Sequence, residues 1–352
     1  MRDGIGHGTR SLHPRHGPHD PTTATPPQRR GALRRTTTID LLRPAGLDGD
    51  VIVDGRGRDL LLAGDGRARV VGESGVRARL DFMGGCALLE IETDPPVDAI
   101  QELLGAAVAS GFRAKVGAAV PEEAAGRTLL HLLLDDMPGA VLVSGYALHT
   151  GGGAHDMRAD RAAQEAFLAG RANLCAGFAT DATMLSELAE TGIMPMPQGP
   201  AAPALESPEH PPAWHDHGEL PPGGIRRRRR MDVLGEGERL RVDAMFRDTH
   251  RDPAGVETII HEYVMTAEID RADLRVLSID ATPRVLPWVE CPRAAGSAQS
   301  LVGQTVHELR TWVRARLQGT ATCTHLNDLL RSLADLDRLE SELGDGAGSG
   351  LS

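Results

Sequence analysis

Strand-like and helix-like segments follow one another in the same order twice along this chain, and this order limits the possible folds more than any other feature. Apolar runs separated by Gly-rich turns extend from about residue 34 to 92, and a helical pattern follows at 97–110. Strand-like runs resume after the run Arg226–Arg230, and helical patterns follow at 297–317 and 324–342. Runs of strands followed by runs of helices indicate an α+β fold.

Short sequence matches between the two halves predict an internal repeat. The matches keep their order along the chain, and their separations differ only by the length of a loop. They include Asp40 and Asp232 (232 − 40 = 192), Asp59 and Asp248 (248 − 59 = 189), and His131 and His325 (325 − 131 = 194). We therefore predict two similar halves, each an antiparallel sheet followed by two helices.

The same patterns predict the boundaries of the regions. A helical insert and a segment rich in Pro and Gly separate the two halves. The predicted regions are a disordered tail (1–30), a first half (31–150), a helical insert (151–192), a linker or extended segment (193–225), a second half (226–342) and a second disordered tail (343–352).

Composition and charge exclude several classes of partner. The chain of 352 residues has a formal net charge of −11, which argues against nucleic acid or an anionic membrane as its main partner. Aromatic residues make up only 3%, too few for base-stacking platforms. The first 30 residues lack the apolar core of a signal peptide. We expect a cytoplasmic protein whose partner is a small molecule or another protein.

A thiol and an imidazole lie close together at the start of the last predicted helix, at Cys323 and His325. Unpaired N–H groups at a helix N-terminus favour negative charge and lower the pKa of a thiol. A second cysteine, Cys291, precedes them, and neither cysteine has a cysteine counterpart in the first half. The second half is therefore expected to carry the functional site.

Besides a redox pair of Cys291 with Cys323, three interpretations of this site are open. The first is a metal site for zinc or iron, since both metals accept nitrogen and sulfur ligands. The second is a hydrolytic or acyl-handling enzyme in which Cys323 is the nucleophile and His261 the base. The third is a non-catalytic binding module with structural cysteines and histidines. The metal ligands we predict are Cys291, Cys323, His325, Asp248 and His250.

Other clusters of polar residues are weaker indications of a functional site than Cys323 and His325. His7, His13, His16 and His19 lie in the predicted tail, and His210, His215 and His217 lie in the predicted linker, where solvated histidines are typical. The run Arg226–Arg230 could bind phosphate, but alternating Arg residues on a strand more often form a solvated face beside Asp residues.

The second half resembles a bacterial family of unknown function, DUF2889. The resemblance covers about residues 226–340 and is carried by Arg230-Met-Asp232, Asp248, His261-Glu-Tyr263, Pro287 to Cys291 and Cys323-Thr-His-Leu326. It implies no activity. A fainter resemblance is to iron–sulfur scaffold proteins of the NifU type, although this chain lacks the first of their three cysteines, because Cys86 lies in the other half.

Overall fold

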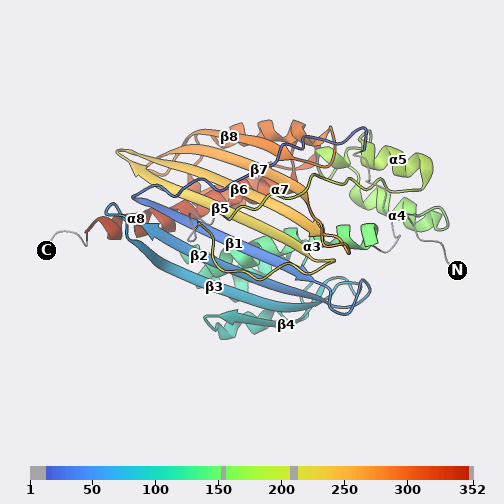
Figure 1. The fold of residues 1–352 in the computed structure, drawn as a ribbon, viewed down its shortest axis with the longest axis horizontal. Helices are drawn as coiled ribbons and strands as arrows, with labels where there is room; N and C mark the ends of the chain where they lie inside the picture. The colour runs from blue at the N-terminus through green and yellow to red at the C-terminus, as the bar shows by residue number, and fades with distance from the viewer. Residues whose placement is uncertain (1–12, 152–155, 207–212, 349–352) are drawn as a thin grey trace.

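The computed structural model of the protein describes residues 13–151, 156–206 and 213–348 (Figure 1). Its fold is α+β, and eight strands form one antiparallel sheet. The strands are β1 (Ala32–Leu42), β2 (Val51–Leu62), β3 (Ala68–Asp81), β4 (Ala87–Asp94), β5 (Ile225–Glu236), β6 (Arg239–Arg251), β7 (Glu257–Asp270) and β8 (Val276–Val285).

The strand order is β4-β3-β2-β1-β5-β6-β7-β8. β1 and β5 pair antiparallel at the centre, with Thr37 opposite Arg229. We expected a sheet in each half, whereas all eight strands share one sheet. The reason is that β1 and β5 would otherwise both be edges with unpaired backbone groups.

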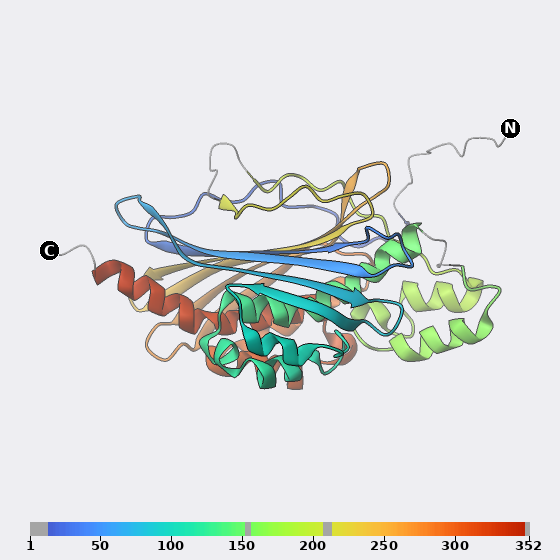
Figure 2. The ribbon, with the colours of Figure 1, turned by 90° about the horizontal axis from the view of Figure 1, so that it is seen from below.

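Helices cover one face of the sheet, which we call the inner face (Figure 2). α3, α7 and α8 contact the strands, and α1, α2 and α6 pack beside them. α4 and α5 lie beyond one end of the sheet (Figure 1). The helices are α1 (Phe112–Ala119), α2 (Pro121–Gly126), α3 (Leu129–Gly151), α4 (Arg161–Arg171), α5 (Thr183–Thr191), α6 (Leu309–Arg316), α7 (Thr324–Ser332) and α8 (Leu336–Gly348).

Two of the predicted helices are shorter than expected. The pattern at 97–110 forms a 3₁₀ helix over Asp98–Leu103, and the pattern at 297–317 is divided between the 3₁₀ helix Cys291–Leu301 and α6. Gly105 and Gly303 follow these 3₁₀ helices with φ of 76° and 84°, a left-handed conformation that interrupts a helix. Apolar residues three apart suit a 3₁₀ helix as well as an α-helix.

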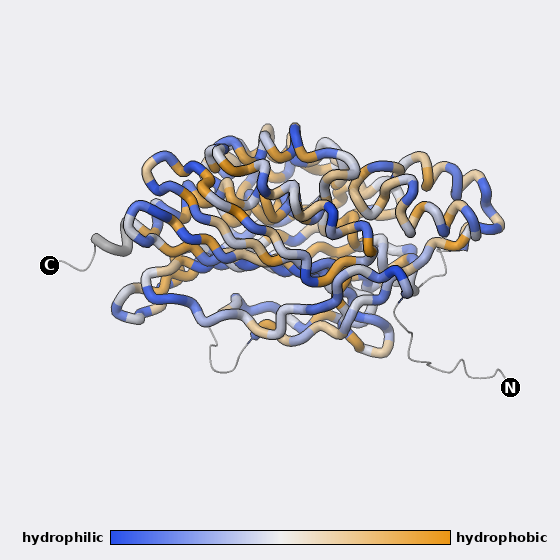
Figure 3. The backbone as a smooth tube through the Cα atoms, turned by 90° about the horizontal axis from the view of Figure 1, so that it is seen from above, coloured by the Kyte–Doolittle hydropathy of each residue, from blue (hydrophilic) through white to orange (hydrophobic). Residues whose placement is uncertain are grey.

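The core lies between the sheet and the helices. Apolar and polar residues are interspersed along the backbone of the sheet (Figure 3). The leucines that predicted a helix after residue 324 are all fully buried: Leu326, Leu329, Leu330, Leu333, Leu336 and Leu339. Their burial fixes α7 and α8 against the inner face. None of the described helices combines the length and the apolar character that crossing a membrane requires.

Two extended segments run across the opposite, outer face of the sheet (Figure 2). In the first, Thr22 accepts a hydrogen bond from Arg247 through its carbonyl oxygen and donates its backbone N–H to Glu262. In the second, Trp214 packs in a cluster with Met245 on β6 and donates to Thr25 Oγ1 at 2.8 Å. Residues 13–30 were expected to be disordered, but hydrogen bonds such as those of Thr22 tie them to the sheet. His7 and His210 lie outside the described residues.

Candidate functional site

Three polar side chains meet where α7 begins over the inner face. Asp248 on β6 and His261 on β7 are opposite one another in the strand register. His325 occupies the first turn of α7. One ligand atom from each of these three residues lies within 4.8 Å of the others. We call Asp248, His261 and His325 the triad.

A register shift between β6 and β7 helps to form the triad. Asp248 is paired with His261, but the next residue, Thr249, is paired with Ile259, so Ile260 has no partner on β6. Such bulges re-aim side chains and are frequent beside active sites. Here the bulge places His261 over Asp248.

The two imidazole rings of the triad stack. The ring centroids of His261 and His325 lie 3.8 Å apart with an interplanar angle of 21°. His261 Nδ1 lies 3.4 Å from Asp248 Oδ2, which is long for a hydrogen bond. Among the described residues, neither His261 Nδ1 nor His325 Nε2 has a hydrogen-bond partner. Both buried nitrogens can therefore accept a further partner.

Asp248 is fixed by Arg227 on β5. Arg227 Nε donates to Oδ1 at 2.7 Å, and Nη2 donates to Oδ2 at 2.9 Å. Burial alone would raise the pKa of Asp248, but the charge and hydrogen bonds of Arg227, together with His261 and His325, outweigh burial and hold this pKa well below its usual range. Arg227 Nη1 also donates to Asp328 Oδ2 on α7 at 2.9 Å. The carboxylate of the triad is therefore ionised and tied to α7.

Arg227 belongs to a larger network of buried ion pairs between the sheet and the helices. Arg35 pairs with Asp59 and Asp335, Arg229 pairs with Asp136, and Arg331 pairs with Asp135 and Asp328. On the outer face, Arg226 pairs with Asp40. The prediction of a solvated Arg226–Arg230 face is wrong, because four of these side chains are buried. The expected Asp partners are present.

α3 approaches this network closely at Gly139. A Cβ at Gly139 would lie 2.6 Å from Arg227 Nη1 and closer still to Asp328 Oδ2. Real Cβ atoms essentially never show such contacts. Only glycine lets α3 pack directly on the Arg227–Asp328 pair.

A cavity of about 200 Å³ adjoins the triad. Its walls come from five parts of the chain. These are α3, the end of α4 with the segment that follows it, α5, β7, and the residues just before the 3₁₀ helix Cys291–Leu301. His261 and His325 line it, as do three of the four cysteines, Cys175, Cys291 and Cys323. Most of the other lining residues are apolar or aromatic. An apolar cavity with a few converging polar groups is the usual form of a small-molecule site.

The predicted thiols lie at this cavity and not within the triad. Cys323 precedes α7, and its Sγ is 3.8 Å from His325 Nδ1. Burial raises the pKa of Cys323 to about 12 and that of Cys291 well above its ordinary value. Burial also lowers the pKa of His325 to about 3. At neutral pH these thiols and the imidazole of His325 are uncharged.

His250 lies apart from the triad. It is buried on β6, and its ring makes an edge contact with Tyr146 on α3, with centroids 5.3 Å apart. Of the five predicted metal ligands, the structure brings Asp248 and His325 into the triad and Cys323 next to it. Cys291 lines the same cavity, whereas His250 does not. His261, predicted as a base, takes the third position.

Sequence reasoning did not assign several residues around the site. Arg227 was visible only as part of an Arg run, and Asp328 only as the residue that closes the Cys-Thr-His-Leu-Asn-Asp stretch. Cys175 lies between the two short helices of the predicted insert, where the sequence gives it no role. Its position in the cavity depends on how α4 and α5 pack against the second half, which no local pattern reports.

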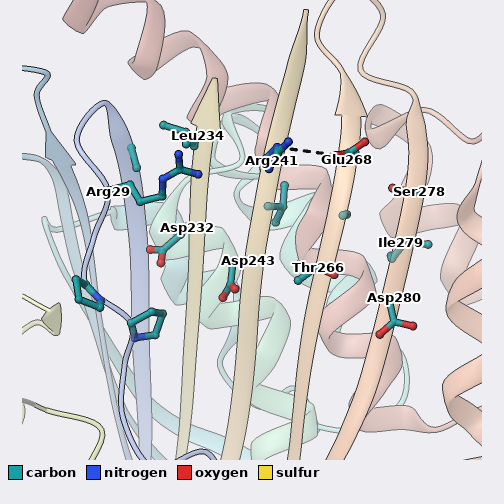
Figure 4. Close-up of a pocket in the computed structure, with 15 residues that line it drawn as sticks. Arg29, Asp232, Leu234, Arg241, Asp243, Thr266, Glu268, Ser278, Ile279 and Asp280 are labelled. Atoms are coloured by element: carbon teal, nitrogen blue, oxygen red, sulfur yellow. Dashed lines mark ion pairs between the residues drawn. The ribbon is translucent and has the colours of Figure 1, made fainter. Parts of the chain in front are cut away.

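A second hollow, of about 500 Å³, lies on the outer face of β5–β8 (Figure 4). Charged side chains line it, and several of them form ion pairs: Arg241 lies 3.9 Å from Glu268, and Asp232 binds Arg34, which lies outside the lining. Because three of the carboxylates that line it, Asp232, Asp243 and Glu268, already have cationic partners, this hollow is a weaker candidate than the cavity at the triad.

Comparisons with known proteins identify one family. A search of curated proteins and a search of solved structures both found no match to the chain. These comparisons do not confirm the NifU-type resemblance. The family described as "Protein of unknown function (DUF2889)" matches residues 225–338, which include the whole triad, Cys291 and Cys323. This segment of the chain therefore belongs to the DUF2889 family.

Proposed function

We propose that the protein binds a divalent transition-metal ion, zinc or iron(II), through Asp248, His261 and His325. Two imidazoles and one carboxylate are a common ligand set for catalytic zinc and for non-haem iron. Such a set leaves coordination positions open for water or a substrate. The adjoining cavity would supply the space for that substrate.

The observation that carries this proposal is the pair of unpartnered nitrogens. His261 Nδ1 and His325 Nε2 are buried beside a carboxylate and form no hydrogen bond in the described part of the chain. A buried polar atom without a partner costs about 1–3 kcal/mol. A metal ion would satisfy both nitrogens. His325, with its pKa of about 3, is already in the neutral form that binds metals.

Arg227 does not prevent this coordination. A carboxylate offers about four acceptor positions, and Arg227 takes two of them on Asp248. The charge of Arg227 is shared with Asp328, which lowers its repulsion of a cation. Carboxylates that bind metals are commonly held by such second interactions.

Metal analysis of the untagged full-length protein tests the proposal. Samples would be loaded with Zn(II), or with Fe(II) under anaerobic conditions, desalted and analysed for bound metal. We expect stoichiometric metal in the wild type and loss of it in His261→Gln and His325→Gln. His250→Gln is the matched control, because His250 is a buried histidine of β6 outside the triad. Absence of metal from the loaded wild type, or full retention by folded His325→Gln, would refute the site.

Cys323 lies beside His325, and a bound cation would favour its thiolate. Cobalt(II) substitution separates the possible ligand sets. A thiolate-to-cobalt charge-transfer band that disappears in Cys323→Ser would make Cys323 a ligand. A cobalt spectrum that is the same in both proteins would restrict the ligands to the triad.

The second candidate is the hydrolytic or acyl-handling enzyme with Cys323 as nucleophile and His261 as base. The shared cavity favours it, because both side chains reach the same space. The raised pKa of Cys323 opposes it, since the thiolate is the nucleophile. Burial of both predicted thiols favours the third interpretation, a binding protein without thiol chemistry.

We also propose that residues 31–150 and 226–342 are two similar halves. Arg34 pairs with Asp232 and Arg226 pairs with Asp40, and each pair joins β1 to β5. The equivalent residues of the two pairs are 192 positions apart, since 226 − 34 and 232 − 40 both equal 192. Superposition of the two halves in an experimental structure tests this arrangement. An alignment that fails to match β1–β4 with β5–β8 in this register would contradict it.

A further inference from the structure

The cavity beside the triad has an open, apolar mouth. Leu142 on α3 and Leu174 after α4 line it, and their exposed fractions are 46% and 47%. Large apolar side chains that border a cavity and remain exposed are typical of a site for an apolar ligand. Deeper in the cavity, Trp288, Met184 and Ile260 continue the apolar wall.

One permanent charge faces this apolar space. Arg171, at the end of α4, lines the cavity, and its guanidinium lies 5.6 Å from the centre of the Phe167 ring. Among the described residues, no carboxylate lines the cavity and none forms an ion pair with Arg171. The cavity therefore offers a cation without an anionic partner, unlike the paired arginines of the buried network.

We propose that this cavity binds a small amphipathic monocarboxylate, with its apolar body against the cavity wall and its carboxylate on Arg171. An apolar cavity of about 150 Å³ accommodates benzene. The volume of about 200 Å³ here suits a molecule the size of benzoate. The planar fork of a guanidinium matches a carboxylate. A phosphate dianion would need more donors than this single Arg provides.

This inference deepens the proposed function and rests on it in one respect: the ion at the triad would act on the molecule held in the cavity. Binding itself depends on Arg171 and the apolar wall and not on the ion. It can therefore be measured in metal-free protein, and its failure can be distinguished from failure of the metal site.

Calorimetry on the full-length, metal-free protein tests whether the cavity prefers an anionic ligand. The probes are benzoate, benzyl alcohol and benzylamine, which share a ring and differ in the polar group. We expect benzoate to bind about five- to tenfold more tightly than benzyl alcohol, and benzylamine to bind least tightly, because of Arg171. Arg171→Met should remove this preference. Arg314→Met, which changes an exposed arginine of α6 outside the cavity, should preserve it.

Gly145 on α3 provides an independent test of the location. It lines the cavity, and a Cβ added there would meet no atom within 4 Å, so a larger side chain would occupy the empty space. Gly145→Leu should abolish benzoate binding and leave the protein folded, since leucine favours a helix. Gly117→Leu on α1, where a Cβ also meets no atom, is the matched control and should bind normally.

Three results would overturn the proposal: equal affinity of the wild type for benzoate and benzyl alcohol, an unchanged preference in Arg171→Met, or normal benzoate binding by folded Gly145→Leu. His325→Gln is measured in parallel for metal and for benzoate. Loss of its metal with benzoate still bound would support both proposals. Benzoate binding by a wild type that takes up no metal would refute the metal site alone.

Discussion

Cys323 Sγ lies 3.8 Å from His325 Nδ1, and burial keeps both groups uncharged. Burial raises the pKa of the thiol to about 12 and lowers the pKa of the imidazole to about 3. Proton transfer from the thiol to the imidazole would create two buried charges. The contact therefore joins two groups that are uncharged at neutral pH.

The reactivity of Cys323 follows from this neutral state. At pH 7.5 we expect metal-free protein to react with iodoacetamide at Cys323 about a thousandfold more slowly than an ordinary thiol, because so little thiolate is present. Mass spectrometry of folded and urea-unfolded samples measures the difference. Rapid modification of Cys323 in the folded protein would instead favour the nucleophile hypothesis.

Gly139→Ala should destabilise the protein, although alanine normally favours a helix. The added Cβ would collide with the buried Arg227–Asp328 pair, and forcing an atom into a packed core costs about 1–3 kcal/mol. Urea unfolding measures the change. Gly117→Ala is the control, because its Cβ meets open space and should stabilise α1 by about 0.5–1 kcal/mol. Equal stability of the two variants would mean that α3 does not approach the pair so closely.

Arg227→Met should lower the free energy of unfolding by about 3–5 kcal/mol, because it leaves Asp248 and Asp328 buried beside each other with one cation fewer. For comparison, Arg67→Met breaks an exposed pair with Asp65 and should cost less than about 1 kcal/mol. Chemical unfolding of both variants measures how much each substitution lowers the free energy of unfolding. A small effect at Arg227 would show that the network adapts or admits water.

His215 should make stability depend on pH. Its two ring nitrogens lie 2.8 and 3.0 Å from the hydroxyls of Thr36 and Thr38, and burial lowers its pKa from an ordinary value of 6.5 to about 3. Between these values the unfolded state binds a proton that the folded state does not, so stability falls as the pH decreases. The contribution is at most about 1.4 kcal/mol per pH unit.

Replacing His215 with Gln should remove that contribution. Unfolding free energies of wild type and His215→Gln, measured at several values between pH 4 and 6, give the two slopes. The variant should be less stable near pH 7, where it lacks the imidazole contacts, but should lose less stability on acidification. Parallel curves for the two proteins would contradict the assignment.

Several features of the site were accessible from the sequence. Asp248 and His325 were both among the predicted metal ligands, and the helix start at Thr324 is confirmed. The choice between His250 and His261 was not accessible. It depends on the bulge at Ile260, which sets the residue of β7 that lies opposite Asp248. Nothing in the local pattern marks that register shift.

The sequence alone determined the α+β class, most strand positions and the leucine face of α7 and α8, because these follow from the spacing of apolar residues along a short segment. The tertiary structure decided which charges pair and which imidazoles meet. His261 and His325 are 64 residues apart (325 − 261), and their rings stack only because α7 packs on the sheet at β6, the strand beside β7. Likewise, the sequence alone suggests that Arg227 is a surface residue. Only the tertiary structure shows that it is buried and paired with Asp248 and Asp328. Contacts between distant segments depend on register and packing, which local periodicity does not encode.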